Sequence, residues 1–511
     1  MLFNSYVFVF AFLPVTLVVF HAIGAAGRQR TAVAFLVAAS LFFYGWWNPL
    51  HLPLLCVSAA CNFALGKALG RMAATGSRWR GRLLALGIAG NLAVLGYFKY
   101  ATFVVDNVAA LTGIEFAVRA VVLPLGISFF TFQKIAFLAD SAEGKTASYD
   151  FLGFCLFVFF FPQLIAGPIV HHKDVMDQFA RPSFSRFDHA AFAEGVTFFA
   201  IGLFKKVALA DTMATVATPV FAEAGEGPVS LAAAWTGALA YTLQLYFDFS
   251  GYSDMAVGLA RMFGVRLPYN FASPYKAASI VDFWRRWHMT LSRFLRDYLY
   301  IPLGGNRKGP VRRHLNLLAT MVLGGLWHGA GWTFVIWGAL HGTYLVVNHA
   351  WTAARAGLGL AGPPTAAGLW AGRLLTFLAA MVGWVFFRAE DLDDALAVLA
   401  GMAGANGPIA QGDLLWTVVG PALESPDPLA AMLYAIDNAA ELPLMVLLLG
   451  VVWFLPNSQE IVDGMGAEAS RLRSLSIRWR PNTAWAFGIS TVLLFCFTRF
   501  SEVSAFLYFN F

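Results

Sequence analysis

The residue best suited to chemistry is His328, a single histidine in the apolar run from Gly324 to Trp332. An ionisable side chain is costly in such a segment, so it marks a candidate functional site. Imidazole takes up and releases protons near neutral pH, which makes it suitable as a general base. A structural hydrogen-bonding role is the alternative. Four flanking glycines permit close backbone approach, and Trp327 and Trp332 could wall a pocket, so we favour a functional role.

A second histidine, His288, lies in the segment from Asp282 to Tyr300, whose apolar residues form one stripe at helical spacing. This pattern predicts one amphipathic helix in the cytoplasmic interface of a membrane. Anchoring is the simplest role for such a helix. Its arginines, continued by the loop that follows, could instead form a mouth for an anionic cytoplasmic substrate, and the residues concerned are Arg285, Arg286, Arg293, Arg296, Arg307 and Lys308.

Other polar side chains precede these histidines in the chain. Tyr241, Gln244 and Asp248 share one helical face, and Asp254 and Asn270 follow in equally apolar surroundings. Buried carboxylates must pair with a partner or face a wet cavity. We therefore favour a structural hydrogen-bond network that ties helices together, with a wet cavity as the alternative.

His341 follows His328 by thirteen residues, which on a continuous helix places it roughly 140° round the axis. We therefore expect His341 to be structural, or at most to support the site indirectly. The histidines, cysteines and carboxylates show no metal-ligand spacing, so we expect no metal site.

The composition indicates the kind of element that holds these residues. Of 511 residues, 59% are apolar and only 13% are charged, where a soluble protein carries roughly 25%. We predict an all-α polytopic integral membrane protein with a single domain over residues 1–511. The net charge of +6 comes from lysines and arginines in short loops, which indicates membrane topology and not nucleic-acid binding.

Apolar runs predict about 11 to 12 membrane-crossing helices, with re-entrant and interfacial helices besides. Arg28 and Arg30 follow the first run, whereas the turn after the second has no lysine or arginine, so we expect the N-terminus outside the cytoplasm. Irregular backbone is expected at Leu123–Ser128 and Gly324–Gly331. The predicted spans are 4–23, 31–47, 52–66, 83–99, 150–169, 190–210, 229–247, 314–328, 332–350, 367–388, 429–456 and 484–500.

The motifs together resemble the membrane-bound O-acyltransferase family, and within it the bacterial alginate O-acetyltransferase branch. The resemblance is carried by the runs Tyr241–Tyr275, Phe283–His288, Arg296–Arg307, Phe161–Ile169, Leu326–Gly329, Trp337–Gly342 and the aromatic tail Phe506–Phe511. It implies helices around a central tunnel, with His328 as the catalytic residue and His288 as the second family histidine. Asp248, Asp254, Asn270, Trp327 and Gln244 would line the tunnel or orient the site.

The resemblance also implies a reaction. Acetyl-CoA would be the acetyl donor, no cofactor would be permanently bound, and the acceptor would be a hydroxyl of an exported polysaccharide such as alginate. No Gly-x-Ser-x-Gly nucleophile motif occurs, so we expect an extracytoplasmic acetyltransferase or carrier protein to complete delivery. The expected location is the bacterial inner membrane, among its lipids. The alternatives are D-alanyl transfer to teichoic acid and a proton-coupled transporter.

Overall fold

The protein is described by a computed structural model covering residues 1–114, 122–360, 362–418, 420, 439–464, 477–500 and 506–507. Within these ranges the chain forms helices and no strands, as predicted for an all-α protein. It divides into two compact units. Unit 1 contains residues 1–203, 252–269 and 480–510, and unit 2 contains residues 204–251, 270–479 and 511. Each unit is built from several separate stretches of the chain. These stretches do not test whether residues 1–511 form a single domain, so that assignment stays a prediction.

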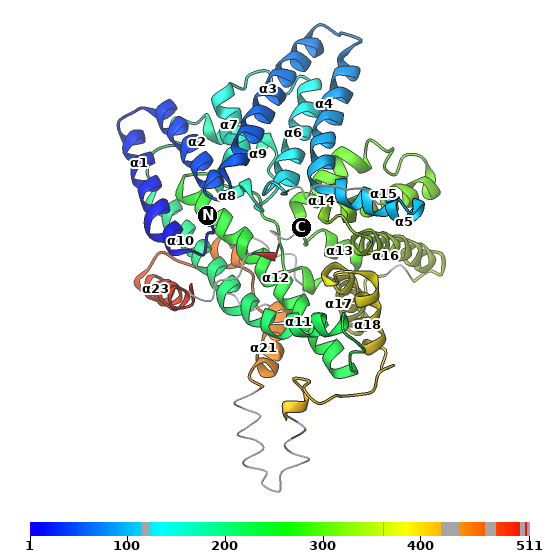
Figure 1. The fold of residues 1–511 in the computed structure, drawn as a ribbon. Coiled ribbons are helices and arrows are strands. Elements are labelled where there is room, and N and C mark those ends of the chain that lie inside the picture. Colours follow the sequence, from blue (N-terminus) through cyan, green and yellow to red (C-terminus); the bar gives the residue numbers. More distant parts are fainter. Residues whose placement is uncertain are drawn as a thin grey trace. The chain divides into compact units, whose positions relative to one another are not determined.

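Unit 1 contains the N-terminal helices and the helix nearest the C-terminus. Helices α3 and α4 pack against α6, and α1 packs against α2 (Figure 1). The elements are η1 (Phe8–Phe12), α1 (Leu13–Ala25), α2 (Gln29–Gly45), η2 (Pro49–His51), α3 (Leu52–Ala74), α4 (Arg80–Leu95), η3 (Gly96–Tyr100), α5 (Ala101–Thr112), α6 (Ile127–Ala142), α7 (Phe151–Phe159), α8 (Phe161–Leu164), α9 (His172–Phe179), α10 (His189–Phe204) and α23 (Thr483–Thr498).

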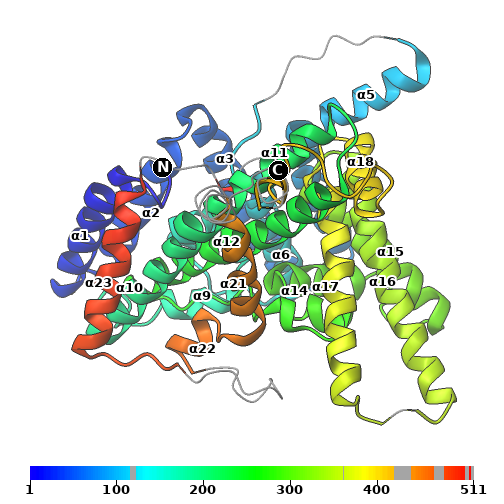
Figure 2. The ribbon, with the colours of Figure 1, turned by 90° about the horizontal axis from the view of Figure 1, so that it is seen from below.

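Unit 2 contains both candidate histidines, on short helices and on a long antiparallel hairpin. Figure 2 shows α15 and α16 side by side, with α17 next to α16. The elements are η4 (Lys205–Ala210), α11 (Asp211–Ala224), η5 (Pro274–Lys276), α13 (Ile280–Trp284), α14 (Met289–Leu295), η6 (Arg296–Tyr300), α15 (Gly309–His328), α16 (Trp332–Gly357), α17 (Ala366–Arg388), α18 (Leu392–Met402), α21 (Glu441–Phe454) and α22 (Ser458–Val462). Helix α12 (Leu231–Met262) supplies residues to both units.

Membrane-crossing potential is concentrated in a few of these helices. In the described residues, four helical stretches are long and apolar enough to cross a bilayer, namely Phe8–Ala25, Pro49–Ala74, Arg80–Thr112 and Ala366–Arg388. Three shorter apolar helices are α2, α21 and α23. The larger predicted number of crossings stays a prediction. Some residues that bear on the predicted topology and family resemblance lie outside the described residues. They are the charged loop residues Asp427 and Arg471 and the tail residues 508–511.

Three predicted elements were wrong. No span was predicted between 100 and 149, yet α6 lies there and is almost wholly buried despite its polar residues. The predicted span 150–169 is two short helices, because the chain turns at Phe160, whose ψ is 108°. The amphipathic segment 282–300 is broken between α13 and α14, and four of its apolar side chains are buried in unit 2, namely Phe283, Trp287, Leu291 and Phe294. Its place in a membrane interface stays a prediction.

Irregular backbone occurs close to both predicted places. Gly126 has φ 72° and immediately precedes α6, so the turn at Leu123–Gly126 is as expected. In the second run, Gly324 and Gly325 remain helical, and only Gly329–Gly331 is extended. The break therefore falls directly after His328, which places this histidine at the end of its helix.

Candidate active site

His328 is the last residue of α15, and the close packing of α15 on α16 fixes its position. A methyl group at Gly325 would collide with the carbonyl oxygen of Phe334, and one at Gly338 would collide with that of Met321. Only glycine permits this backbone approach. These glycines therefore allow α15 and α16 to pack closely, and His328 lies where the chain turns from one helix to the other.

Aromatic rings surround the His328 imidazole, which is 3% exposed. The ring centroid of Trp327 lies 4.9 Å away, and those of Trp337 and Phe387 each lie 5.2 Å away. Three helices supply these walls, because Phe387 belongs to α17. The imidazole thus lies in a buried, low-dielectric environment, in which electrostatic interactions are stronger than in water.

His288 lies beside His328, with 6.3 Å between the two ring centroids. The break between α13 and α14 brings it there, since His288 has φ 41°, in the left-handed region that non-glycine residues rarely occupy. Two backbone hydrogen bonds join the residues around this break to residues 270 and 272. Met289 N–H donates to the Asn270 carbonyl, and Ala272 N–H donates to the Arg286 carbonyl. An unfavourable backbone conformation of this kind often marks a functional site.

Asn270 holds the His288 ring. Its Oδ1 lies 3.1 Å from His288 Nδ1 and also accepts a hydrogen bond of 2.6 Å from the Thr290 hydroxyl. With Oδ1 as acceptor, Nδ1 carries the proton, and Nε2 is then the basic nitrogen. His288 lies outside the candidate membrane spans, and its complete burial lowers its pKa to about 3. The ring is therefore neutral near pH 7.

The predicted tunnel residues fall into different places. Trp327 contacts His328 and Asn270 contacts His288, and their tunnel or orienting role stays a prediction. Asp248 instead accepts a hydrogen bond of 2.7 Å from the buried Lys206, which also contacts Asp211 at 2.8 Å. A buried charge normally has such a partner, so this triad explains how Asp248 tolerates burial.

Gln244 is buried in unit 2, where its Oε1 has no hydrogen-bond partner among the described residues. Asp254 is also buried, but it lies in the C-terminal part of α12, which belongs to unit 1. An orienting role for these two residues stays a prediction.

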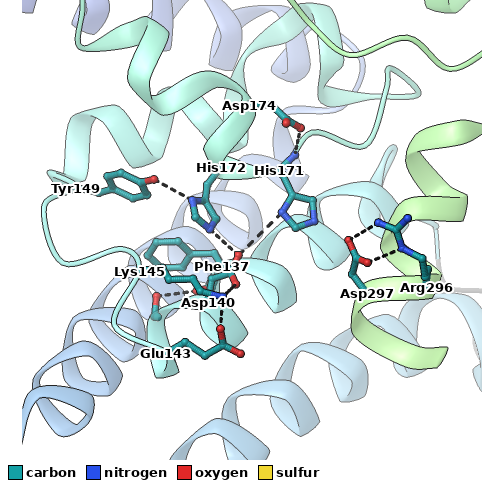
Figure 3. Close-up of polar contacts among 11 residues, drawn as sticks. Phe137, Asp140, Glu143, Lys145, Tyr149, His171, His172, Asp174, Arg296 and Asp297 are labelled. Atoms are coloured by element: carbon teal, nitrogen blue, oxygen red, sulfur yellow. Dashed lines mark hydrogen bonds and ion pairs between the residues drawn. The ribbon is translucent and has the colours of Figure 1, made fainter. Parts of the chain in front are cut away.

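The six basic residues predicted to bind a donor differ in their availability. Arg286 pairs with Asp282 at 2.9 Å, and Arg296 pairs with Asp297 at 2.7 Å (Figure 3). Arg293 is half-buried. The other three are exposed and form no ion pair with the residues that the structure describes: Arg285, Arg307 and Lys308.

His341 belongs to the surroundings of the site. It is fully buried on α16, and its ring lies 4.9 Å from that of Trp337, which also contacts His328. The prediction of a structural or supporting role fits this arrangement. Phe249 and Phe387, which contact His288 and His328, were not predicted, because single aromatic residues are common in every apolar run.

A second histidine cluster, in unit 1, was also missed. The Tyr149 hydroxyl lies 2.9 Å from His172 Nδ1, and His172 Nε2 lies 2.7 Å from a carboxylate oxygen of Asp140 (Figure 3). Lys145 lies 3.6 Å from the same carboxylate. The adjacent pair His171–His172 was the available signal in the sequence. The cluster joins α6 to α9, and a structural role accounts for it.

Comparisons with known proteins agree with the resemblance seen in the motifs. The model of the membrane-bound O-acyltransferase family matches residues 74–387. A peptidoglycan O-acetyltransferase of Helicobacter pylori is 43% identical over 433 residues, covering 80% of each chain. A probable alginate O-acetylase of Azotobacter vinelandii is 46% identical over 410 residues, covering 79% of this chain and 78% of the relative.

A more distant relative is a teichoic acid D-alanyltransferase of Streptococcus thermophilus. It is 29% identical over 238 residues, covering 44% of this chain and 57% of the relative. The matches at higher identity and coverage are those with proteins named for O-acetyl transfer. The predicted resemblance is therefore confirmed.

Proposed function

This chain belongs to the membrane-bound O-acyltransferase family, and from that premise we propose that it transfers acetyl groups at the His328–His288 pair for the O-acetylation of an exported polysaccharide. The chain is a membrane enzyme of the O-acetyltransferase type. The polysaccharide, the donor and the residues that act are our proposals. One observation carries them: two buried histidines from separate elements lie with their rings 6.3 Å apart.

We propose that His328 acts as the general base. Its imidazole removes the proton from the acceptor hydroxyl as the oxygen attacks the carbonyl carbon of an acetyl thioester. The carbon–sulfur bond then breaks, and the proton passes from the imidazolium to the departing thiolate. The aromatic walls exclude water, which would otherwise hydrolyse the thioester.

We propose that His288 is a second, orienting histidine. Since Asn270 occupies its Nδ1, His288 presents Nε2 as an acceptor that can hold a hydroxyl or thiol by a hydrogen bond. Its neutral state at pH 7 suits this role, because an imidazolium could not accept.

The donor we propose is cytoplasmic acetyl-CoA. Its phosphates require cationic partners, and three exposed side chains would bind them, namely Arg285, Arg307 and Lys308. The chain would lie in the bacterial inner membrane with its N-terminus outside the cytoplasm, and an extracytoplasmic acetyltransferase or carrier protein would take the acetyl group to its final acceptor.

Purified protein in liposomes tests the catalytic assignment. We expect His328→Ala to abolish acetyl-CoA turnover, and His288→Ala to reduce it strongly. His349→Ala is the matched control, since this half-buried α16 histidine forms a hydrogen bond within its own helix, to the Leu345 carbonyl. Wild-type turnover by His328→Ala would falsify the assignment.

The match with the teichoic acid D-alanyltransferase gives a second candidate donor, a D-alanyl thioester on a carrier protein. Presenting both donors to the same liposomes distinguishes the two. We expect turnover with acetyl-CoA alone, and turnover only with the D-alanyl carrier would favour the alternative.

A further inference from the structure

Unit 1 has an apolar groove on its surface that the proposed reaction does not use. The groove has a volume of about 540 Å³ and is lined by residues of α1, α10 and α23. Figure 2 shows these three helices near one another. Along η1 and α1 the lining residues recur at helical spacing and so form one face. This face includes Val9, Leu13, Leu17, Val18 and His21.

The groove is as long as the hydrocarbon of one membrane leaflet. From Val9 to His21 the helix rises about 18 Å, and half of a bilayer's hydrocarbon core is about 15 Å. Val18 is 69% exposed within it. Apart from His21 its lining is apolar, with Phe192 on α10 and Phe497 on α23. A lipid acyl chain fits this length and chemistry.

A second, basic pocket of about 600 Å³ meets the groove at the His21 end of α1. Phe187 lines both cavities, and Met262 and Phe192 in the groove directly follow Arg261 and Ala191 in the pocket. His21 joins these parts, since its ring nitrogens lie 3.3 Å from the Ser185 carbonyl and 3.0 Å from the Met262 carbonyl.

The basic pocket has an excess of positive charge. Four arginines line it, and only two carboxylates oppose them. Glu194 is bonded to Arg261 at 2.6 Å, and Asp188 accepts two backbone hydrogen bonds at the start of α10. Arg181 and Arg186 are exposed and form no ion pair with the part of the chain that the structure describes. These two can bind a phosphate.

We infer that unit 1 binds one anionic phospholipid, with its phosphate between Arg181 and Arg186 and an acyl chain along the groove. Neither cavity alone indicates this ligand. The support comes from Phe187, which lines both cavities, because the headgroup and the tail of one lipid must be adjacent. The site is independent of the acetyl transfer proposed above.

Thermal unfolding of the purified full chain in detergent tests the site. Dioleoyl phosphatidylglycerol is expected to raise the unfolding midpoint by a few degrees and to saturate, since a ligand that binds the folded state stabilises it. Dioleoyl phosphatidylcholine and inorganic phosphate are expected to have little effect. An equal shift with phosphatidylcholine, or with phosphate alone, overturns the proposal.

Two pairs of variants locate the binding. Arg181→Gln with Arg186→Gln is expected to lose the shift, and Arg28→Gln with Arg30→Gln, an equal charge change at another pocket of unit 1, is expected to keep it. Val18→Trp fills the groove and is expected to lose the shift, whereas Val15→Trp, on the same helix outside the groove lining, keeps it. Equal loss in a control variant contradicts the assignment.

Native mass spectrometry provides a second measurement that does not depend on unfolding. Wild-type protein is expected to retain one phosphatidylglycerol through delipidation, and the Arg181→Gln, Arg186→Gln variant to retain none. Retention of the lipid by this variant rejects the arginines as its ligands.

Discussion

At the scale of single residues, the hydrogen bond between Asn270 and His288 controls which ring nitrogen is basic. Asn270→Ala removes the acceptor of Nδ1–H, and we expect turnover to fall about five- to tenfold, because one such bond contributes about 1 kcal/mol. Thr290→Val leaves the histidine bond intact, so a smaller loss is expected. Acetyl-CoA turnover in liposomes measures both, and an equal loss in the two variants would contradict the orienting role.

The left-handed backbone at His288 predicts an unusual order of stability. Both His288→Gly and His288→Ala remove the imidazole, but only glycine adopts φ 41° without cost. We expect the glycine variant to be more stable than the alanine variant by about 1 kcal/mol. Thermal unfolding midpoints in detergent compare the two, and a less stable glycine variant would show that the φ value imposes no strain.

Among single residues, the sequence predicted those whose chemistry conflicts with their surroundings. His328 and Asn270 stand out for that reason, and His288 lies in the segment with the apolar stripe. Lys206 was missed as the partner of Asp248, because the two residues are 42 positions apart and no periodic signal joins them. Pairing at this sequence separation requires the three-dimensional fold.

At the scale of elements, the α15–α16 hairpin depends on glycine at the helix contact. Gly338→Ala places a methyl group against the Met321 carbonyl, so we expect a lower unfolding midpoint and reduced turnover. Gly357→Ala on the same helix meets no atom within 4 Å, and there alanine should be neutral or stabilising by up to about 1 kcal/mol. Similar behaviour of the two variants would contradict the packing argument.

Hydropathy predicted most of the apolar helices but missed α6. The apolar residues of α6 are interrupted by Gln133, Lys134 and Asp140, which are buried with the rest of the helix. The break at His288 was missed for another reason. The stripe of apolar residues continues across it, while the hydrogen bonds that accompany the break come from residues 270 and 272.

At the scale of the whole molecule, the charge distribution predicts an orientation in the membrane. In a cysteine-free background, Ser5→Cys should react with an impermeant maleimide from outside intact cells, and Arg28→Cys only after permeabilisation. These positions lie before and after the first candidate span. Labelling of residue 28 in intact cells would reverse the predicted topology.

The backbone conformation at position 288 suggests how to remove the imidazole without disturbing the fold. An asparagine or glycine there can keep the left-handed turn while lacking the imidazole. Such a variant would separate folding from turnover and yield an intact enzyme with strongly reduced turnover. It could then be saturated with its thioester substrate and held for cryo-microscopy, giving a direct view of the bound donor before transfer.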